Sequence, residues 1–259
     1  MNKFFTIFFS LVLFTSYLSC KTITAQAAAI QEPIPKRDWS FNGIFGTFDR
    51  GSLQRGLQVY LEVCSSCHSL KLVSYRHLYG IGLNEKQIKE IASEFEVTDG
   101  PNDEGEMFER PAKPSDRFVS PYPNDNSARA SNNGAMPPDL SLMVKARKGG
   151  VDYLHALLTG YKEEPPSGIT LSDGMMYNVY YPGNQIAMAA PLEDDAVEYS
   201  DGTNATIEQL ATDVSTFLAW AAEPELEERK SLGIKVLLFL FVLTGLLYAL
   251  KRQIWADQH

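Results

Sequence analysis

The sequence predicts a mainly α-helical protein with long irregular loops and one C-terminal transmembrane helix. Three observations lead to this fold class. Apolar residues recur with helical spacing along much of the chain, whereas the alternation typical of strands is rare. An apolar run lies near each end of the 259 residues. Two of only three cysteines lie three positions apart, which argues against a disulfide framework and for a local binding motif.

The N-terminus has the pattern of a secretory signal peptide. Lys3 precedes a short apolar stretch from Phe4 to Leu18, and Ala25-Gln26-Ala27 provides a small-residue cleavage site. We therefore expect residues 1–27 to be removed and residues 28–230 to form an exported domain. The alternative is a retained N-terminal membrane anchor.

The first half of this domain carries signals for two helices and a loop. Ser52 can cap a helix whose apolar residues recur every three or four positions as far as Cys64. Asn84, with Gln87 three residues later, forms a capping box for a second helix. Residues 101–134 are rich in Pro, Asn, Asp and Ser, and this composition predicts a long ordered loop.

Three more helices are predicted in the second half of the domain. Pro137-Pro138-Asp139 indicates a helix start, and Gly149-Gly150 indicates where that helix ends. Residues 151–159 form another helical stretch. Thr206-Ile207-Glu208-Gln209 is a second capping box, and an apolar stripe with helical spacing follows it as far as Ala221.

The C-terminal apolar run predicts a transmembrane helix over residues 231–250. The nineteen residues from Leu232 to Leu250 span about 28 Å as a helix, close to the roughly 30 Å hydrocarbon thickness of a bilayer. Lys235 is the charged exception, and near the outer end it can extend its amine to the headgroups. With an N-terminal signal peptide, residues 251–259 form a short cytoplasmic tail.

The charge distribution argues against nucleic acid as a partner. The net charge is −9, whereas a nucleic-acid-binding protein needs a positive surface. Acidic residues concentrate in residues 81–110, with nine acids against three bases, and in residues 193–201, with five acids and no base. For any single carboxylate, solubility is the simpler interpretation. As blocks, the acids can steer a basic protein partner.

The cysteine pair belongs to a CxxCH motif, the signature of c-type haem attachment. Two thiols three residues apart near a helix end can reach the two vinyl groups of one porphyrin, and the next imidazole then lies under the iron. The motif predicts one haem c bound covalently to Cys64 and Cys67, with His68 as an axial ligand.

Two other interpretations of the cysteine pair remain open. A redox-active disulfide would be expected in alternating strands and helices, which the sequence lacks. Half of a zinc site would need His77 or His155 to complete it, because no second cysteine pair exists.

The sixth ligand of the iron separates an electron carrier from a haem enzyme, because a closed thioether site blocks other ligands and raises the redox potential. Met136 and Met188 both lie in non-helical segments, and the residues alone leave the two nearly equal. Weaker candidates are a methionine on an apolar helix face, two in a turn and two histidines: Met143, Met175, Met176, His77 and His155.

From about Trp39 to Trp255 the sequence resembles the cytochrome c1 family, the haem c subunits of cytochrome bc1 complexes. The motifs that carry the resemblance are GTFDR (46–50), VCSSCHSL (63–70), YR (75–76), DGPN (99–102), GEMF (105–108), NNGAMPPDLS (132–141) and WAAEPE (220–225). Any one of them could arise by chance, whereas their combination in this order is highly specific.

The resemblance implies a cytochrome c-like helical haem domain with Met188 as the sixth ligand. The family's thioether lies in a segment that corresponds here to Tyr181-Pro182-Gly183 and Ile186-Ala187-Met188, whereas Met136 stands where some relatives have Leu. The resemblance further implies that Arg147 lies near a haem propionate and that four other residues line the pocket: Asn132, Pro137, Pro138 and Tyr153. Without further cysteines, no disulfide braces the Met188 loop.

The resemblance also implies an electron relay that is not an enzyme on its own. Electrons would come from a Rieske iron–sulfur protein and leave to a cytochrome c, with cytochrome b and the lipid bilayer as further partners. The rivals are an exported, peroxidase-like haem enzyme with an open sixth position and a haem-free interaction protein. The leader lacks an Arg-rich transit pattern, which favours a bacterial inner membrane, with the haem domain periplasmic, over a mitochondrial inner membrane.

Overall fold

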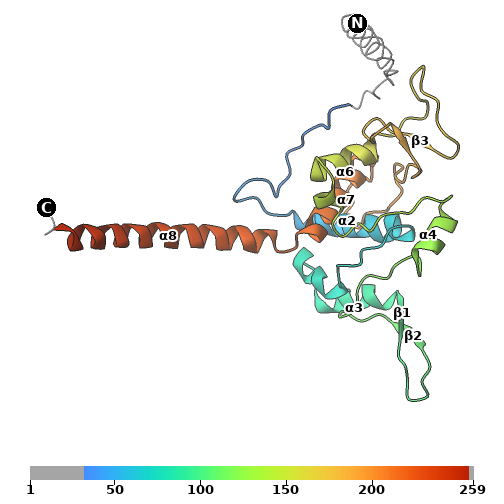
Figure 1. The fold of residues 1–259 in the computed structure, drawn as a ribbon. Coiled ribbons are helices and arrows are strands. Elements are labelled where there is room, and N and C mark those ends of the chain that lie inside the picture. The colour runs from blue at the N-terminus through green and yellow to red at the C-terminus, as the bar shows by residue number, and fades with distance from the viewer. Residues whose placement is uncertain (1–31, 257–259) are drawn as a thin grey trace, which may run out of the picture.

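The computed structural model describes residues 32–256, so the signal peptide expected at residues 1–27 lies outside the described residues. The fold is mainly helical, as predicted, with two small antiparallel hairpins (Figure 1). In chain order the elements are α2 (Arg50–Glu62), η1 (Cys64–Ser66), η2 (Tyr75–Ile81), α3 (Glu85–Ser93), β1 (Glu96–Asp99), β2 (Phe108–Pro111), α4 (Asp125–Ser131), α5 (Met143–Ala146), α6 (Gly150–Thr159), β3 (Met176–Tyr177), β4 (Gln185–Ile186), α7 (Ile207–Ala222) and α8 (Leu226–Ile254).

The centre of the globular part is the packing of α2 against α7 (Figure 1). The predicted apolar stripe of α7 is confirmed, since its large side chains are buried in the core. At Gly56 of α2, an added Cβ would lie 2.1 Å from the carbonyl oxygen of Asp213 and 2.7 Å from Cβ of Phe217. The two helices therefore approach so closely that only glycine fits at this position.

A buried carboxylate links the same two helices. The Asp213 side chain is fully buried and accepts hydrogen bonds from Ser52 Oγ at 2.6 Å and from Gln209 Nε2 at 2.9 Å. Arg55 donates to it through Nε at 2.9 Å and Nη2 at 3.1 Å. Arg55 also pairs with the more exposed Asp201 at 2.7 Å. This Asp213 network joins α2, α7 and the segment before α7.

Side-chain caps begin most of the longer helices in this domain. The Asn84–Gln87 capping box is confirmed, and Thr206 accepts a hydrogen bond from the backbone N–H of Gln209. The expectation that Ser52 caps α2 was wrong. Asp49 is the cap and accepts from the Ser52 N–H at 2.6 Å, because the Ser52 hydroxyl donates to Asp213 instead.

Two other sequence expectations need correction. The stretch 101–134 is not all loop, since it contains β2, which pairs with β1 in the register Glu96↔Pro111, and also α4. The helix expected from Pro137 forms only at α5, because the carboxylate of Asp139 binds Ser69 Oγ and the Lys71 N–H, each at 2.8 Å. These contacts hold the backbone after Pro138 in a non-helical path.

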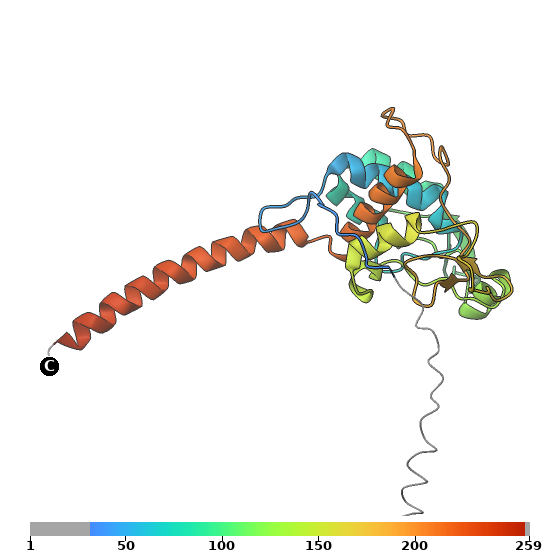
Figure 2. The ribbon, with the colours of Figure 1, turned by 90° about the horizontal axis from the view of Figure 1, so that it is seen from above.

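Helix α8 extends away from the globular part in both views (Figures 1 and 2). It contains the predicted span of residues 231–250 and is longer, running from Leu226 to Ile254. Among residues 32–256 it alone is long and apolar enough to cross a membrane, with a mean hydropathy of 2.2 in its most apolar window, none of which is buried. Apolar helical turns that nothing else in residues 32–256 covers are suited to lipid.

Candidate cofactor site

Cys64 begins the short turn η1, which follows α2 after Val63, and Cys67 comes directly after the turn. The N–H groups of Cys67 and His68 both donate to the Cys64 carbonyl, at 3.2 Å and 2.9 Å. This tight turn presents two unpaired, partly buried thiols and an imidazole from one short segment. Such a grouping suits two thioether bonds to one planar group and one ligand to its metal.

The alternatives for the cysteine pair fit this geometry poorly. Burial raises the pKa of the Cys64 thiol to about 12, whereas a redox-active CxxC needs a thiol whose pKa is lowered. The pair also follows the C-terminal end of a helix rather than preceding an N-terminal end. Within residues 32–256, no group of three or more His, Cys, Asp or Glu side chains could hold a zinc ion.

His68 is oriented as a metal-binding histidine would be. Its Nδ1 lies 2.8 Å from the carbonyl oxygen of Pro138. A carbonyl only accepts, so Nδ1 carries the proton and Nε2 keeps a lone pair. Burial lowers the pKa of His68, which favours the neutral ring needed for metal binding. A hydrogen bond from the second ring nitrogen to a backbone carbonyl is the usual way in which a ligating histidine is held. These residues therefore fit a haem c.

A set of polar contacts, which the sequence analysis missed, holds the Pro138 carbonyl in place. Asp139 binds Ser69 and Lys71, the Leu140 N–H donates to the Ser69 carbonyl at 2.9 Å, and Ser141 Oγ accepts from the Leu72 N–H at 3.0 Å. This arrangement clamps residues 138–141 against the segment that follows His68. The sequence signal for these contacts was the small polar side chains in residues 69–72 and 139–141. Neither segment alone indicates that it bonds to the other.

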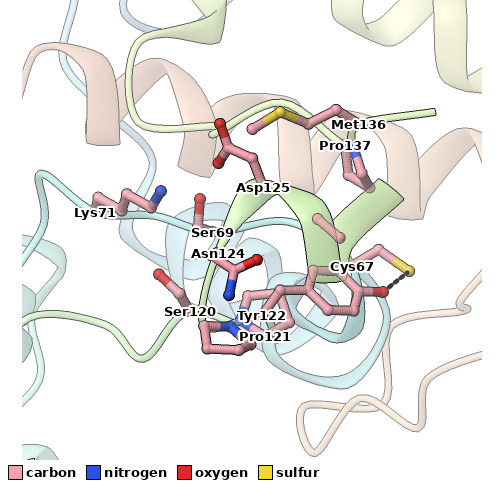
Figure 3. A pocket seen from close by; sticks show the side chains of 12 residues that line it. Cys67, Ser69, Lys71, Ser120, Pro121, Tyr122, Asn124, Asp125, Met136 and Pro137 are labelled. Carbon is pink, nitrogen blue, oxygen red and sulfur yellow. Dashed lines mark hydrogen bonds between the residues drawn. The ribbon is translucent and has the colours of Figure 1, made fainter. Parts of the chain in front are cut away.

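A pocket of about 270 Å³ opens beside Cys67 (Figure 3). Figure 3 shows the Tyr122 hydroxyl turned to the Cys67 sulfur, 4.0 Å away, with Met136 and Pro137 on another side of the pocket. Asn132 supports this wall, because its Nδ2 donates to the Tyr122 hydroxyl at 3.1 Å and to the Ala128 carbonyl at 2.7 Å. Cys67, Asn132 and Pro137, all expected at the site, therefore lie together.

The position of Met136 argues against it as the sixth ligand. Met136 is two residues from Pro138, and two extended residues span at most about 7 Å. Pro138 contacts the Nδ1 edge of His68, the edge that faces away from a metal bound at Nε2. Met136 thus lies on the side of the site where Pro138 holds His68.

Met188 lies after the β3–β4 hairpin and is partly buried. Its carbonyl accepts a hydrogen bond from the Tyr161 hydroxyl at 3.2 Å. Burial raises the pKa of Tyr161, so the phenol keeps the proton that it donates. The contact holds the backbone of residue 188 and leaves the thioether free to act as a ligand.

Two buried asparagines, which the sequence analysis did not identify, brace the hairpin before Met188. Asn178 is fully buried, donates to the Leu157 carbonyl at 2.8 Å and accepts from the N–H groups of Tyr180 and Tyr181. Asn184 donates to the carbonyls of Asn178 and Val179, each at 3.1 Å. Asn184 thereby holds the hairpin connection together, and Asn178 ties it to the end of α6 through the Leu157 carbonyl.

Arg147 and Tyr153, both expected in the pocket, lie near each other, but neither lines the pocket beside Cys67. Tyr153 is buried on α6, and its pKa is raised by burial, while the positive charge of nearby Arg147 acts in the opposite direction. Arg147 follows α5 and is exposed, with a single weak hydrogen bond from Nη1 to the Ala146 carbonyl at 3.4 Å. The rest of its guanidinium can therefore pair with a carboxylate such as a propionate.

The weaker ligand candidates have other positions. Met143 is buried in the core, as its place on an apolar helix face indicated. His77 Nδ1 accepts from the Ser74 N–H at 3.1 Å and so caps η2. His155 is buried beside Trp39, with Nε2 3.4 Å from a carboxylate oxygen of Glu208. Each of these side chains therefore has a structural role of its own.

The two acidic blocks, residues 81–110 and 193–201, differ in how many of their carboxylates are bonded within the protein. In the first, Asp103, Glu104 and Glu106 lie exposed on the connection between β1 and β2. In the second, Asp194 accepts from the Ile207 N–H at 2.8 Å and Asp201 pairs with Arg55. Part of the second block therefore stabilises the fold, while the hairpin end of the first block is available to a partner.

Comparisons with known proteins agree on one family. The model of the cytochrome C1 family matches residues 39–258. Cytochrome c1 of Rhodospirillum rubrum is 49% identical over 248 residues, which cover 90% of this chain and 91% of that protein. The mitochondrial cytochrome c1 heme protein of Schizosaccharomyces pombe is 54% identical over 220 residues, covering 85% and 71%. Cytochrome b/c1 of Bradyrhizobium diazoefficiens is 48% identical over 246 residues, which cover 87% of this chain but only 36% of that relative.

Proposed function

Because the chain belongs to the cytochrome c1 family, we propose that it is the haem c subunit of a cytochrome bc1 complex. It relays single electrons from a Rieske iron–sulfur protein to a cytochrome c. The observation that carries this proposal is the CxxCH turn with His68 Nδ1 held by the Pro138 carbonyl, which leaves Nε2 for iron. The chain is not an enzyme on its own but a subunit of a quinol–cytochrome c oxidoreductase.

In this function the protein holds one haem c through Cys64 and Cys67, with His68 and Met188 as axial ligands. When bound, the haem supplies a one-electron iron couple. Pro138 orients His68, and Tyr161 fixes the backbone of Met188. Ligands that do not move between oxidation states keep the reorganisation small, which favours fast electron transfer.

Other residues shape the surroundings of the haem. Arg147 would neutralise a propionate, while Asn132, Pro137, Pro138 and Tyr153 would line the pocket. Buried Tyr153 would limit the access of water, and low polarity around a bound haem raises its potential. With both ligand positions filled by the protein, the site would exclude small substrates, as a relay requires.

Helix α8 anchors this subunit in the membrane beside cytochrome b. The apolar turns of α8 support the membrane placement, since no other part of residues 32–256 covers them. We propose a single-pass orientation in a bacterial inner membrane, with the haem domain on the periplasmic side and residues 251–259 in the cytoplasm. The relatives come from bacteria and from mitochondria, so the choice of membrane rests on the leader.

The spectrum of the purified full-length protein tests the relay against its rivals. We expect a pyridine haemochrome band for one haem c per chain, low-spin ferric iron and no binding of carbon monoxide to the reduced protein. A high-spin ferric spectrum with carbon monoxide binding would support the haem enzyme with an open sixth position. A colourless protein from cells that mature c-type cytochromes would support the haem-free interaction protein.

The exposed acids of the β1–β2 connection are expected to steer a basic cytochrome c. Raising ionic strength from about 0.01 M to about 0.15 M shortens the Debye length from roughly 30 Å to roughly 8 Å, so the bimolecular rate of cytochrome c reduction should fall severalfold. Stopped-flow kinetics measures this rate. The variant Glu104→Gln/Glu106→Gln should show a shallower salt dependence. A rate that does not respond to salt would rule out electrostatic steering.

A further inference from the structure

We propose that residues 42–47, termed here the interfacial loop, insert Ile44 and Phe45 into the headgroup region of the bilayer that α8 spans. The loop would thereby give the haem domain a second membrane contact, besides its helix. This inference rests on the membrane anchoring proposed for α8.

The segment that contains the loop separates its apolar side chains into two sets. Trp39, Phe41 and Phe48 are buried in the core, and Phe41 packs between the other two rings at centroid distances of 5.7 Å and 4.7 Å. Ile44 and Phe45, at the loop tip, are 68% and 83% exposed. The flanking aromatics thus fix the base of a loop whose tip presents two large apolar side chains outward.

The loop is built as a tight, ordered turn. The Thr47 N–H donates to the Ser40 carbonyl at 3.1 Å and closes its base. Gly43 has φ +71°, a region that favours glycine. At Gly46 an added Cβ would lie 1.9 Å from the Asn42 carbonyl oxygen, so no other residue fits. The tip therefore has a defined position rather than a freely sampled one.

Contacts with the first turns of α8 set the height of the loop above the membrane. Lys230 Nζ donates to the carbonyls of Phe41 at 2.6 Å and Gly46 at 3.0 Å, one on each side of the tip. Glu227 accepts from the Phe48 N–H at 2.7 Å and pairs with Arg50 at 2.6 Å. Both helix residues lie within two turns of the first residue of the apolar run.

These contacts place the tip where lipid begins. The apolar run starts at Leu232, only about 3 Å along the helix axis beyond Lys230. In both views the loop reaches out from the globular part alongside the first turns of α8 (Figures 1 and 2). Lipid headgroups surround a spanning helix at the level where its apolar turns start, so a loop fixed beside those turns meets them.

The chemistry of the loop matches that environment. No charged residue occurs between Trp39 and Phe48, so insertion does not require burying a charge in the interface. Peripheral membrane proteins place large apolar side chains at the boundary between headgroups and acyl chains. The ammonium of Lys230, beneath the loop, adds a positive charge at the headgroup level.

Spin-label accessibility in the full-length holoprotein, carrying Cys20→Ser and reconstituted in phospholipid nanodiscs, tests the proposal. A nitroxide is attached to Phe45→Cys, and its collision rates with oxygen and with a water-soluble nickel chelate are compared. Met107→Cys, at an exposed site between β1 and β2, is the aqueous control, and Leu240→Cys, in the middle of α8, is the bilayer control. We expect the oxygen-to-nickel ratio at position 45 to be severalfold that at position 107 and below that at position 240.

Three results would overturn the proposal, and they can be told apart. If position 45 matches position 107 while position 240 reports lipid, the loop stays in water although the membrane anchor is correct. If position 240 also reports water, the anchoring proposed for α8 fails and the loop contact falls with it. If position 45 becomes shielded only in the assembled complex, the loop contacts a protein partner and not lipid.

Discussion

Replacing Met188 by leucine is expected to lower the redox potential of the haem by a few tenths of a volt, out of the roughly 0.8 V over which axial ligands tune haem iron. Leucine keeps most of the apolar volume but has no lone pair to bind iron. The loss of the thioether removes the ligand that favours the ferrous state. Potentiometric titration measures the shift, and loss of the methionine-to-iron absorption band accompanies it.

The Met188→Leu variant should still fold, which makes its spectrum interpretable. The contacts that hold residue 188 act on its backbone, through Tyr161, and on the hairpin before it, through Asn178 and Asn184. Carbon monoxide should now bind the reduced protein, because the sixth position is open. Met136→Leu is the matched control and should leave both band and potential unchanged. If the Met136 variant loses the band and the Met188 variant keeps it, the ligand assignment is wrong.

Replacing Asp213 by alanine is expected to lower the free energy of unfolding by about 3 kcal/mol. The fully buried carboxylate accepts four hydrogen bonds, two of them from Arg55. Its removal leaves Ser52 and Gln209 without their partner and a largely buried guanidinium with only Asp201. A fall of roughly 6–12 °C in the unfolding temperature should follow for a domain of this size, measured by circular dichroism of the full-length protein in detergent.

The neighbouring pair supplies the control for the Asp213 variant. Asp201 binds the same arginine, but its side chain is 45% exposed, so water replaces the lost contact. Asp201→Asn should therefore lower the free energy of unfolding far less than Asp213→Ala, as expected of an exposed ion pair. Equal losses of unfolding free energy in the two variants would show that burial of the Asp213 carboxylate does not determine how strongly the network stabilises the fold.

Several features of this protein were predictable because their signals are local. The CxxCH motif and the capping box at Asn84 each depend on residues within two helical turns, and the apolar run of α8 depends on consecutive residues. The apolar stripe of α7 was equally readable, since a helix that buries one face repeats its apolar residues every three or four positions. Local patterns of this kind need no knowledge of what lies opposite.

Errors arose where a side chain had two possible partners. Ser52 is a good helix cap by type, but Asp213 takes its hydroxyl and Asp49 caps instead. The start of a helix at Pro137 was expected from local preference, yet Asp139 binds the segment after His68. The β1–β2 hairpin was missed because its four-residue strands show little apolar alternation, with mostly exposed or half-buried side chains.

The sequence alone determined the covalent attachment motif, the membrane-spanning run and the family, because those signals lie in the order and spacing of neighbouring residues. Only the tertiary structure decided what surrounds them. Pro138 reaches His68 across 70 positions, and Asp213 reaches Ser52 across 161. A hydrogen bond acts over about 3 Å in space whatever the separation along the chain, so such partners emerge only once the chain has folded.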